Sequence, residues 1–170
     1  VHNLLIKYTD ACFLYLRRQV QSGADVIQIF DSWANLLTKE GLIEYSFNYI
    51  NALISALKLD PVTKNIPVIV FARNPKCNIE ELINTSADCI SLFWSMNDLN
   101  FDLAKNKVAI QGNLDPKILL ESDEIIQRET YKILEKFERY PGYIFNLGHG
   151  ITPDINPDKI KYLTNIVREY

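Results

Sequence analysis

The sequence predicts an α/β fold built on a parallel sheet, and three observations support this prediction. Short segments rich in β-branched residues alternate with longer segments of helical periodicity along the 170 residues. The short segments are apolar throughout, which is typical of parallel strands buried on both faces. Polar residues follow each of them, as in folds whose strands lead into helices. Five such strands fit either an open doubly wound sheet or part of an eight-stranded barrel, because an intact barrel needs about 250 residues.

The first expected elements are a helix, a strand and a second helix. Apolar residues recur at helical spacing over 3–21, and Gly23 is a suitable C-terminal stop for that helix. The segment 24–30 (ADVIQIF) is short and rich in β-branched residues, so it predicts a buried strand. Helical spacing returns over 40–58, where the next helix is expected.

The middle of the chain is expected to contain two strands on either side of a short helix. The strands are predicted at 66–72 (IPVIVFA) and 87–94 (ADCISLFW). The helix is predicted at 78–86, with Asn78 as its N-cap and Glu81 three residues on as the other half of a capping box.

The last part of the chain is expected to add two strands and two helices. The strands are predicted at 107–113 (KVAIQGN) and 142–148 (GYIFNLG). A long helix is predicted at 123–138 after the N-cap Ser122, and Pro157 lies near the start of the last helix.

Composition argues against several classes of function. The net charge is −3 and no basic stripe is present, so nucleic acid is not expected as a partner. No apolar run approaches the roughly 20 residues that a membrane helix needs. No G-x-G-x-x-G follows the first strand, which argues against dinucleotide binding. Cys12, Cys77 and Cys89 form neither a disulfide framework nor a zinc pattern, and a reducing compartment fits them best.

Polar or unusual residues follow all five predicted strands. In a parallel sheet the carboxyl ends of the strands share one edge, here called the mouth, where function gathers. Strand ends and helix N-caps are polar in any case, so five coinciding ends are stronger evidence than one. The residues are Asp31, Ser32, Arg73, Asn74, Trp94, Ser95, Asn113, Asp115, Asn146 and His149.

His149 is the most specific candidate among them. It is flanked by Gly148 and Gly150, which allow unusual backbone angles and the close approach of a ligand. An imidazole can donate to a carboxylate or transfer a proton. The alternative is a turn histidine that bonds only locally.

Ser32 and Asp31 allow more than one interpretation. No G-x-S-x-G surrounds Ser32, so a nucleophile is not supported. Ser32 is either a hydrogen-bond donor to an anionic ligand or a helix N-cap. Asp31 is a base, a binder of cationic or N–H groups, or a structural cap.

Three segments of the chain carry a family resemblance. QIFDSWA at 28–34, QGNLDP at 111–116 and IFNLGHGITPD at 144–154 resemble the signatures of the uroporphyrinogen decarboxylase family in sequence, order and spacing. The similarity covers essentially the whole chain and corresponds to the C-terminal half of the family's chain. Because the chain opens at Val1 rather than at methionine, we expect it to be an interior part of a longer polypeptide.

The resemblance implies a TIM-type (β/α)8 barrel, of which residues 1–170 form the C-terminal half of a single domain without its N-terminal half. It implies a carboxy-lyase that removes the carboxyl groups of the four acetate side chains of uroporphyrinogen III to give coproporphyrinogen III in haem biosynthesis. It implies no metal or organic cofactor, and a homodimer that binds neither nucleic acid nor membrane. A cytoplasmic location is expected, with an organelle such as a plastid as the alternative.

The resemblance also assigns site residues. His149 matches a pocket histidine that contacts a substrate carboxylate, Ser32 a serine that hydrogen-bonds substrate, and Phe30 an aromatic pocket wall. Asp31 and Arg73 are further substrate-binding candidates, since Arg73 is a cation at the mouth. The family's paired arginines, its pyrrole-binding aspartate and its site tyrosine belong to N-terminal segments that this sequence lacks.

The chain departs from the family pattern at several positions. Asn35 and Ser86 each replace a glycine, Arg73-Asn74 replaces Lys-Gly, and Phe93 stands where the family commonly has Asp. These departures keep a diverged, non-catalytic member as one alternative. A zinc-dependent, corrinoid-linked methyltransferase of the same superfamily is another, although no cysteine lies near His149.

The 170 residues alone are expected to be inactive and marginally stable, since a cut barrel has two open sheet edges. The strand interior that we expect such a cut to open to water consists of Val26, Ile27, Val68, Val70, Ile90 and Ile110.

Overall fold

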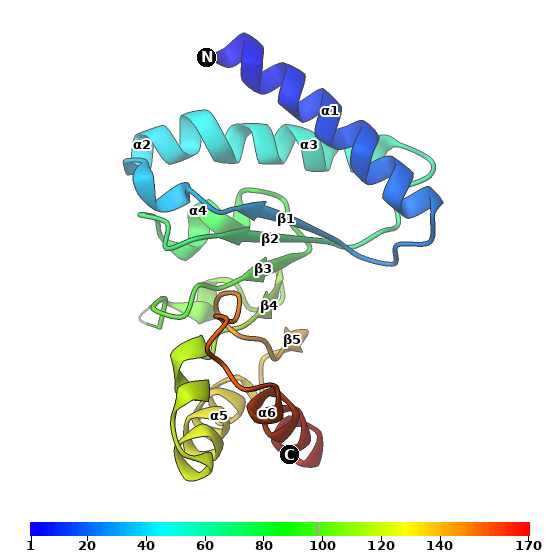
Figure 1. Ribbon diagram of the computed structural model, residues 1–170. Helices are drawn as coiled ribbons and strands as arrows, with labels where there is room; N and C mark the ends of the chain where they lie inside the picture. The colour runs from blue at the N-terminus through cyan, green and yellow to red at the C-terminus, as the bar shows by residue number, and fades with distance from the viewer. Residues whose placement is uncertain (98) are drawn as a thin grey trace.

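The fold is a five-stranded sheet in which every pair of neighbours is parallel and the strand order follows the chain. The structure is a computed structural model that describes residues 1–97 and 99–170. The strands are β1 (Ile27–Asp31), β2 (Val68–Ala72), β3 (Cys89–Ser91), β4 (Ala109–Gln111) and β5 (Tyr143–Ile144) (Figure 1). Doubly wound sheets change direction at a switch point in their strand order, whereas barrels do not. The sheet is therefore part of a TIM-type barrel, as expected, and it is not closed: β1 and β5 are its two edges.

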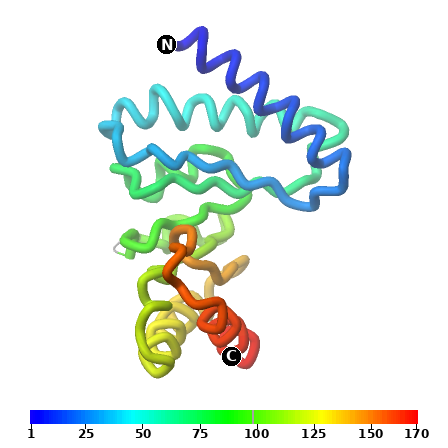
Figure 2. The backbone as a smooth tube through the Cα atoms, in the orientation of Figure 1, coloured from blue at the N-terminus to red at the C-terminus, as the bar shows by residue number. Residues whose placement is uncertain are grey.

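Pairs of helices lie near both edge strands of the sheet (Figure 1). The α-helices are α1 (His2–Gln21), α2 (Lys39–Leu42), α3 (Asn48–Leu59), α4 (Ile79–Ile83), α5 (Asp123–Phe137) and α6 (Pro157–Glu169). The shorter turns are the 3-10 turns η1 (Ala34–Leu36), η3 (Phe101–Leu103) and η4 (Pro116–Leu120), and the π turn η2 (Ile43–Phe47). Figure 1 shows α1 packed on α3 beside β1, and α5 packed on α6 beyond β5. The two termini consequently lie at opposite ends of the molecule (Figure 2).

Several element boundaries differ from the prediction. The predicted helix 40–58 is divided by the π turn between α2 and α3. The predicted strands 87–94 and 142–148 shorten to β3 and β5, because pairing stops before the apolar run ends. Asn78 and Glu81 form the predicted capping box.

The two faces of the sheet have different surroundings. Residues of a strand alternate between faces, and Ile27, Val68, Val70, Ile90 and Ile110 all point toward the helices. Each is at most 2% exposed and belongs to the main core cluster, which also contains residues of α3 and α4. The expectation that the open barrel would expose this set is therefore wrong for these five. Of the expected set only Val26, outside the strand, is largely exposed.

The face that turns away from the helices is the barrel interior. Its residues are Gln28, Phe30, Ile69, Phe71, Cys89, Ser91 and Gln111, which pair across the strands in register. Continuous apolar strands do not reveal which alternate set the helices cover, so sequence pattern alone did not separate the two faces. Among the described residues, no helix is both long and apolar enough to cross a membrane.

Candidate active site

The candidate site lies at the mouth, where the carboxyl ends of the parallel strands meet. Ser32 follows β1, Arg73 follows β2, and His149 lies in the segment after β5. Leu147 in that segment still forms a parallel bridge with Leu114, so the backbone continues along β4 toward the mouth. The prediction that Ser32 and His149 lie at the same end of one parallel sheet is confirmed.

A row of rings connects the predicted residues Phe30 and His149. The ring centroids of Phe30 and Phe71 are 5.9 Å apart, and those of Phe71 and His149 are 6.3 Å apart. Phe93 approaches His149 at 5.9 Å and its neighbour Trp94 at 5.4 Å. These five residues, here called the aromatic row, line the mouth, and the exposed phenyl and indole rings among them are those of Phe30 and Trp94. Sequence reasoning did not single out Phe71.

The position of His149 depends on the neighbouring Gly148. The Gly148 N–H donates to the Leu114 carbonyl at 2.8 Å, and a Cβ atom at Gly148 would overlap the backbone of Trp94. His149 Nδ1 lies 3.3 Å from the Gly150 carbonyl, which can only accept a hydrogen bond. Nε2 makes no hydrogen bond with any described residue, and the side chain is exposed. That nitrogen is therefore available to a ligand in the mouth.

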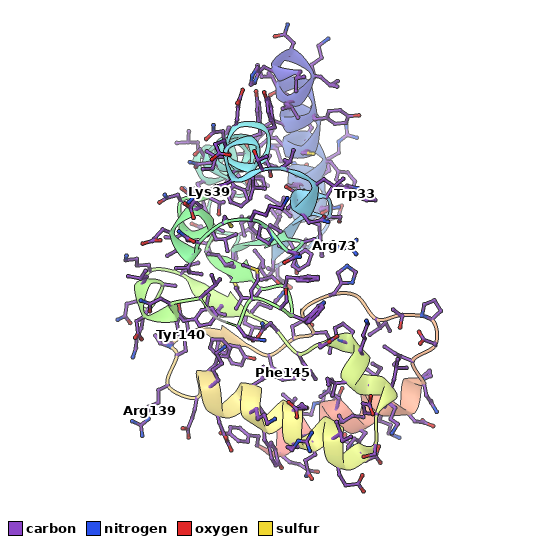
Figure 3. All side chains as sticks on the ribbon, turned by 90° about the vertical axis from the view of Figure 1, so that its left-hand side faces the viewer. Trp33, Lys39, Arg73, Arg139, Tyr140 and Phe145 are labelled. Carbon is purple, nitrogen blue, oxygen red and sulfur yellow. The ribbon has the colours of Figure 1, made fainter. Side chains whose placement is uncertain are left out.

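Arg73 is a second polar group on the same face, and it is half-buried. It lies two residues after Phe71, which places it on the interior face, and its backbone N–H donates to the Asp31 carbonyl at 3.0 Å. Its guanidinium makes no hydrogen bond or ion pair within the part of the chain that the structure describes. In Figure 3, Arg73 and Trp33 lie on one side of the ribbon, and Lys39 and Tyr140 on the other. A guanidinium in this position can bind a carboxylate through two parallel hydrogen bonds.

Asp31 and Ser32 differ in what their side chains contact. Asp31 Oδ1 accepts from the Trp33 N–H at 3.2 Å, and Oδ2 accepts from the Ser46 hydroxyl at 2.5 Å. The Asp31 carboxylate thus holds its own loop, which corresponds to the structural interpretation. The exposed Ser32 hydroxyl has no hydrogen-bond partner among the described residues, and Thr38 rather than Ser32 caps α2. Ser32 is therefore free to donate to a ligand.

Two buried amide side chains, those of Asn113 and Gln111, form hydrogen bonds with residues in and after β3. Asn113 is 1% exposed, and its Nδ2 donates to the Phe93 carbonyl at 3.1 Å and to Asn97 Oδ1 at 3.2 Å. Gln111 Nε2 donates to Ser91 Oγ at 3.0 Å on the interior face. The Q-G-N-L-D-P motif contains both Gln111 and Asn113, but the motif did not predict these contacts.

The departures from the family pattern have visible consequences in the backbone. Asn74 has a φ of 41° and Ser86 a φ of 62°, the left-handed region that glycine adopts without steric cost. Both stand where the resemblance leads us to expect glycine. Asn35, at the third such position, has a buried Oδ1 with no hydrogen-bond partner.

The described residues offer no evident metal ligand set. Among them, no three His, Cys, Asp or Glu side chains gather closely enough to hold an ion. Burial raises the pKa of the Cys89 thiol to about 12, and burial, followed by the nearby Glu81, raises the pKa of Cys77 to about 12. Both thiols are thus poor ligands and nucleophiles near neutral pH. The expectation of a reaction without metal remains a prediction.

Fold and site together define a class of protein. Parallel strands in sequential order, with polar and aromatic side chains gathered at their carboxyl ends, are the arrangement of (β/α)-barrel enzymes. Within that class, the family model described as uroporphyrinogen decarboxylase (URO-D) matches residues 1–170. The chain belongs to the uroporphyrinogen decarboxylase family.

Individual relatives agree with this assignment. The chain is 37% identical over 171 residues to a uroporphyrinogen decarboxylase of Vesicomyosocius okutanii, covering 100% of this chain and 49% of that protein. It is 38% identical over 172 residues to one of Ruthia magnifica, with 100% and 49% covered. It is 40% identical over 177 residues to one of Chlorobaculum parvum, with 99% and 48% covered. The chain thus spans about half the length of the curated relatives it matches.

Proposed function

We propose that the protein carrying this chain removes the acetate carboxyl groups of uroporphyrinogen III, converting its four acetate side chains to the methyl groups of coproporphyrinogen III. The family match over residues 1–170 is the observation that carries the proposal. The relatives from Vesicomyosocius okutanii, Ruthia magnifica and Chlorobaculum parvum are all named uroporphyrinogen decarboxylase. The mouth fits such a substrate, because the exposed rings of Phe30 and Trp94 can pack on pyrrole rings and the polar groups suit its carboxylates.

The chemistry needs a proton and a desolvated carboxylate. A proton added to a pyrrole carbon makes the ring an electron sink, and the bond between the acetate methylene and its carboxyl carbon then breaks. The bond's electron pair flows into the cationic ring and CO₂ leaves, which gives a neutral ring with an exocyclic methylene. The methylene carbon then takes a proton to become a methyl group, and the proton added earlier to the ring carbon is lost, so each CO₂ is replaced by one proton net. Fixed charges and donors around the pyrrole stabilise the cationic ring and hold the remaining carboxylates.

This chain supplies part of that set. His149 Nε2 donates to a substrate carboxylate or transfers a proton, and Ser32 donates a neutral hydrogen bond. Arg73 pairs with a carboxylate at the rim, while Phe30 lines the pocket wall. Asp31 holds the loop that carries Ser32 and remains a substrate-binding candidate. The paired arginines, aspartate and tyrosine of the family belong to the other half of the barrel.

The complete protein is proposed to work as a cytoplasmic homodimer without metal or organic cofactor, with a plastid as the alternative location. The family resemblance supports the homodimer and the absence of a cofactor. The unpaired cysteines support a reducing compartment.

The test is turnover by the full-length protein. Purified enzyme treated with a chelator is incubated anaerobically with uroporphyrinogen III, and coproporphyrinogen is measured by chromatography after oxidation. Undiminished turnover supports the cofactor-independent lyase. Activity that requires zinc would favour the methyltransferase alternative, and tight substrate binding without turnover would favour a non-catalytic member. The names of the relatives favour neither alternative.

A further inference from the structure

The imidazole of His149 is held between rings that come from two neighbouring strands. Phe71 of β2 meets it at an interplanar angle of 69°, and Phe93, just after β3, meets it at 88°. Both are edge-to-face contacts, the geometry that aromatic rings favour. Phe71 and Phe93 are buried, so they form a fixed surface beneath an exposed imidazole.

The backbone around Phe93 is fixed relative to His149 by two contacts. Gly148 packs directly on the backbone of Trp94, where no side chain would fit. Asn113 Nδ2 donates to the Phe93 carbonyl, which anchors the turn from beneath. The backbone of this turn therefore determines the position of the loop that carries His149, and the Phe93 ring belongs to the same turn.

A phenyl ring holds an imidazole differently from a carboxylate. The family resemblance leads us to expect Asp at position 93, and a carboxylate next to an imidazole would accept one of its N–H groups. Phe93 has neither charge nor acceptor, so it orients His149 only by shape and ring electrostatics. Both imidazole nitrogens remain free of side-chain partners among the described residues, and Nδ1 lies near the Gly150 carbonyl.

We propose that Phe93 is a positioning residue: its ring fixes the orientation of the His149 imidazole so that Nε2 faces the substrate. The proposal rests on the proposed function, because it acts through His149 in decarboxylation. It goes beyond that function by assigning a role to a residue that departs from the family pattern.

The test uses Phe93→Leu, which removes the ring and keeps apolar volume, and Phe93→Tyr, which retains the ring, in the full-length enzyme. The matched control is Phe101→Leu. Phe101 packs on Phe137 at 5.3 Å, and its ring does not contact His149. We expect kcat/KM to fall about fivefold in Phe93→Leu and to stay within about twofold of wild type in Phe93→Tyr and in the control.

Two further measurements separate positioning from general destabilisation. In a His149→Ala background, Phe93→Leu should cause no additional loss of kcat/KM, since the residue through which it acts is gone. With ¹³Cε1-labelled histidine, the His149 resonance should move in Phe93→Leu and not in Phe101→Leu, because it would lose a nearby ring current. The signal is assigned by its disappearance in His149→Gln.

A stationary His149 resonance, or an equal loss of activity in the His149→Ala background, would overturn the proposal. A similar loss in Phe101→Leu would do the same. If wild-type enzyme does not decarboxylate uroporphyrinogen, the proposed function fails. The resonance still tests the contact between Phe93 and His149, since it needs no turnover, and Phe93→Met replaces Phe93→Leu if the latter does not fold.

Discussion

At the scale of single residues, His149 has the properties that the proposed mechanism requires, and few contacts of the fold depend on it. Its imidazole is exposed and contacts two rings, and its only hydrogen-bond partner among the described residues is the adjacent Gly150 carbonyl. In the full-length enzyme we expect His149→Ala to lower kcat/KM on the order of tenfold to a thousandfold while leaving the melting temperature almost unchanged.

His2 provides the matched control for this substitution. The chain has two histidines. His2 lies on α1, and its side chain contacts Tyr49 and Glu44 at the surface. His2→Ala should leave kcat/KM at the wild-type value. Wild-type kcat/KM in His149→Ala would remove His149 from the mechanism.

The backbone at Ser86 has a conformation that suits the glycine expected from the family better than it suits serine. Its φ of 62° strains any residue with a Cβ, and its side chain is exposed and makes no hydrogen bond with a described residue. Ser86→Gly should therefore raise the free energy of unfolding by about 0.5 kcal/mol, the relief of strain less the extra entropy of glycine in the unfolded chain.

Ser55→Gly is the control, because Ser55 lies in the regular helix α3. There the same change should lower the free energy of unfolding by about 0.5–1 kcal/mol. Denaturant titration of the two variants measures both values. Destabilisation by Ser86→Gly would show that strain at this turn is not significant.

At the scale of elements, the π turn η2 positions Ser46 against the end of β1. The Ser46 hydroxyl donates to Asp31 Oδ2, while Asp31 Oδ1 accepts from the Trp33 N–H. Ser46→Ala leaves a half-buried carboxylate without its hydroxyl donor and should lower the free energy of unfolding by about 1–2 kcal/mol.

Because the Asp31 loop also carries Ser32, Ser46→Ala should raise KM for the substrate as well. Ser55→Ala, on the next helix, is the control: its exposed hydroxyl makes only a 3.5 Å contact with Asn51, so KM should not change and the free energy of unfolding should change by no more than about 0.5 kcal/mol. Equal stability of the two variants would show that the Ser46 contact contributes little. Calorimetry and steady-state kinetics on the full-length enzyme provide the measurements.

Most elements could be predicted from local pattern, and the misses have physical reasons. β-branched apolar runs located all five strands, and the capping box at Asn78 located α4. The π turn was missed because one additional residue in a turn barely changes apolar spacing over 40–58. The ends of the last three strands were placed too late, for example because Leu92 and Phe93 stay buried after they leave the sheet.

At the scale of the whole molecule, periodicity could not distinguish a doubly wound sheet from a barrel. The family resemblance could, because Q-G-N-L-D-P and L-G-H-G belong to a known barrel. For the site, that resemblance led to His149, Ser32 and Phe30 at one mouth. Contacts such as Phe71 with His149 depend on residues 78 positions apart in sequence, which no local pattern records.

Residues 1–170 alone should neither decarboxylate uroporphyrinogen nor form a robust monomer. The helix-facing core is buried, so instability comes instead from the two sheet edges and from the large apolar side chains beside them that stay exposed. The backbone of β1 and of β5 each lacks a neighbour on one side, a template for association with other chains. Phe30, Trp33 and Ile144 are 63%, 69% and 44% exposed.

Covering a large apolar side chain contributes roughly 1.5–3 kcal/mol, and whole domains are stable by only about 5–15 kcal/mol. Leaving several such side chains in water therefore removes much of the free energy of unfolding.

Expressed alone, the segment should form no coproporphyrinogen and should melt near room temperature or associate, as calorimetry and light scattering would show. Adding the complementary half of the barrel should restore a cooperative transition, because both edges then pair. A monomer of these residues that melts cooperatively at high temperature and turns over substrate would mean that half the barrel suffices for both folding and catalysis.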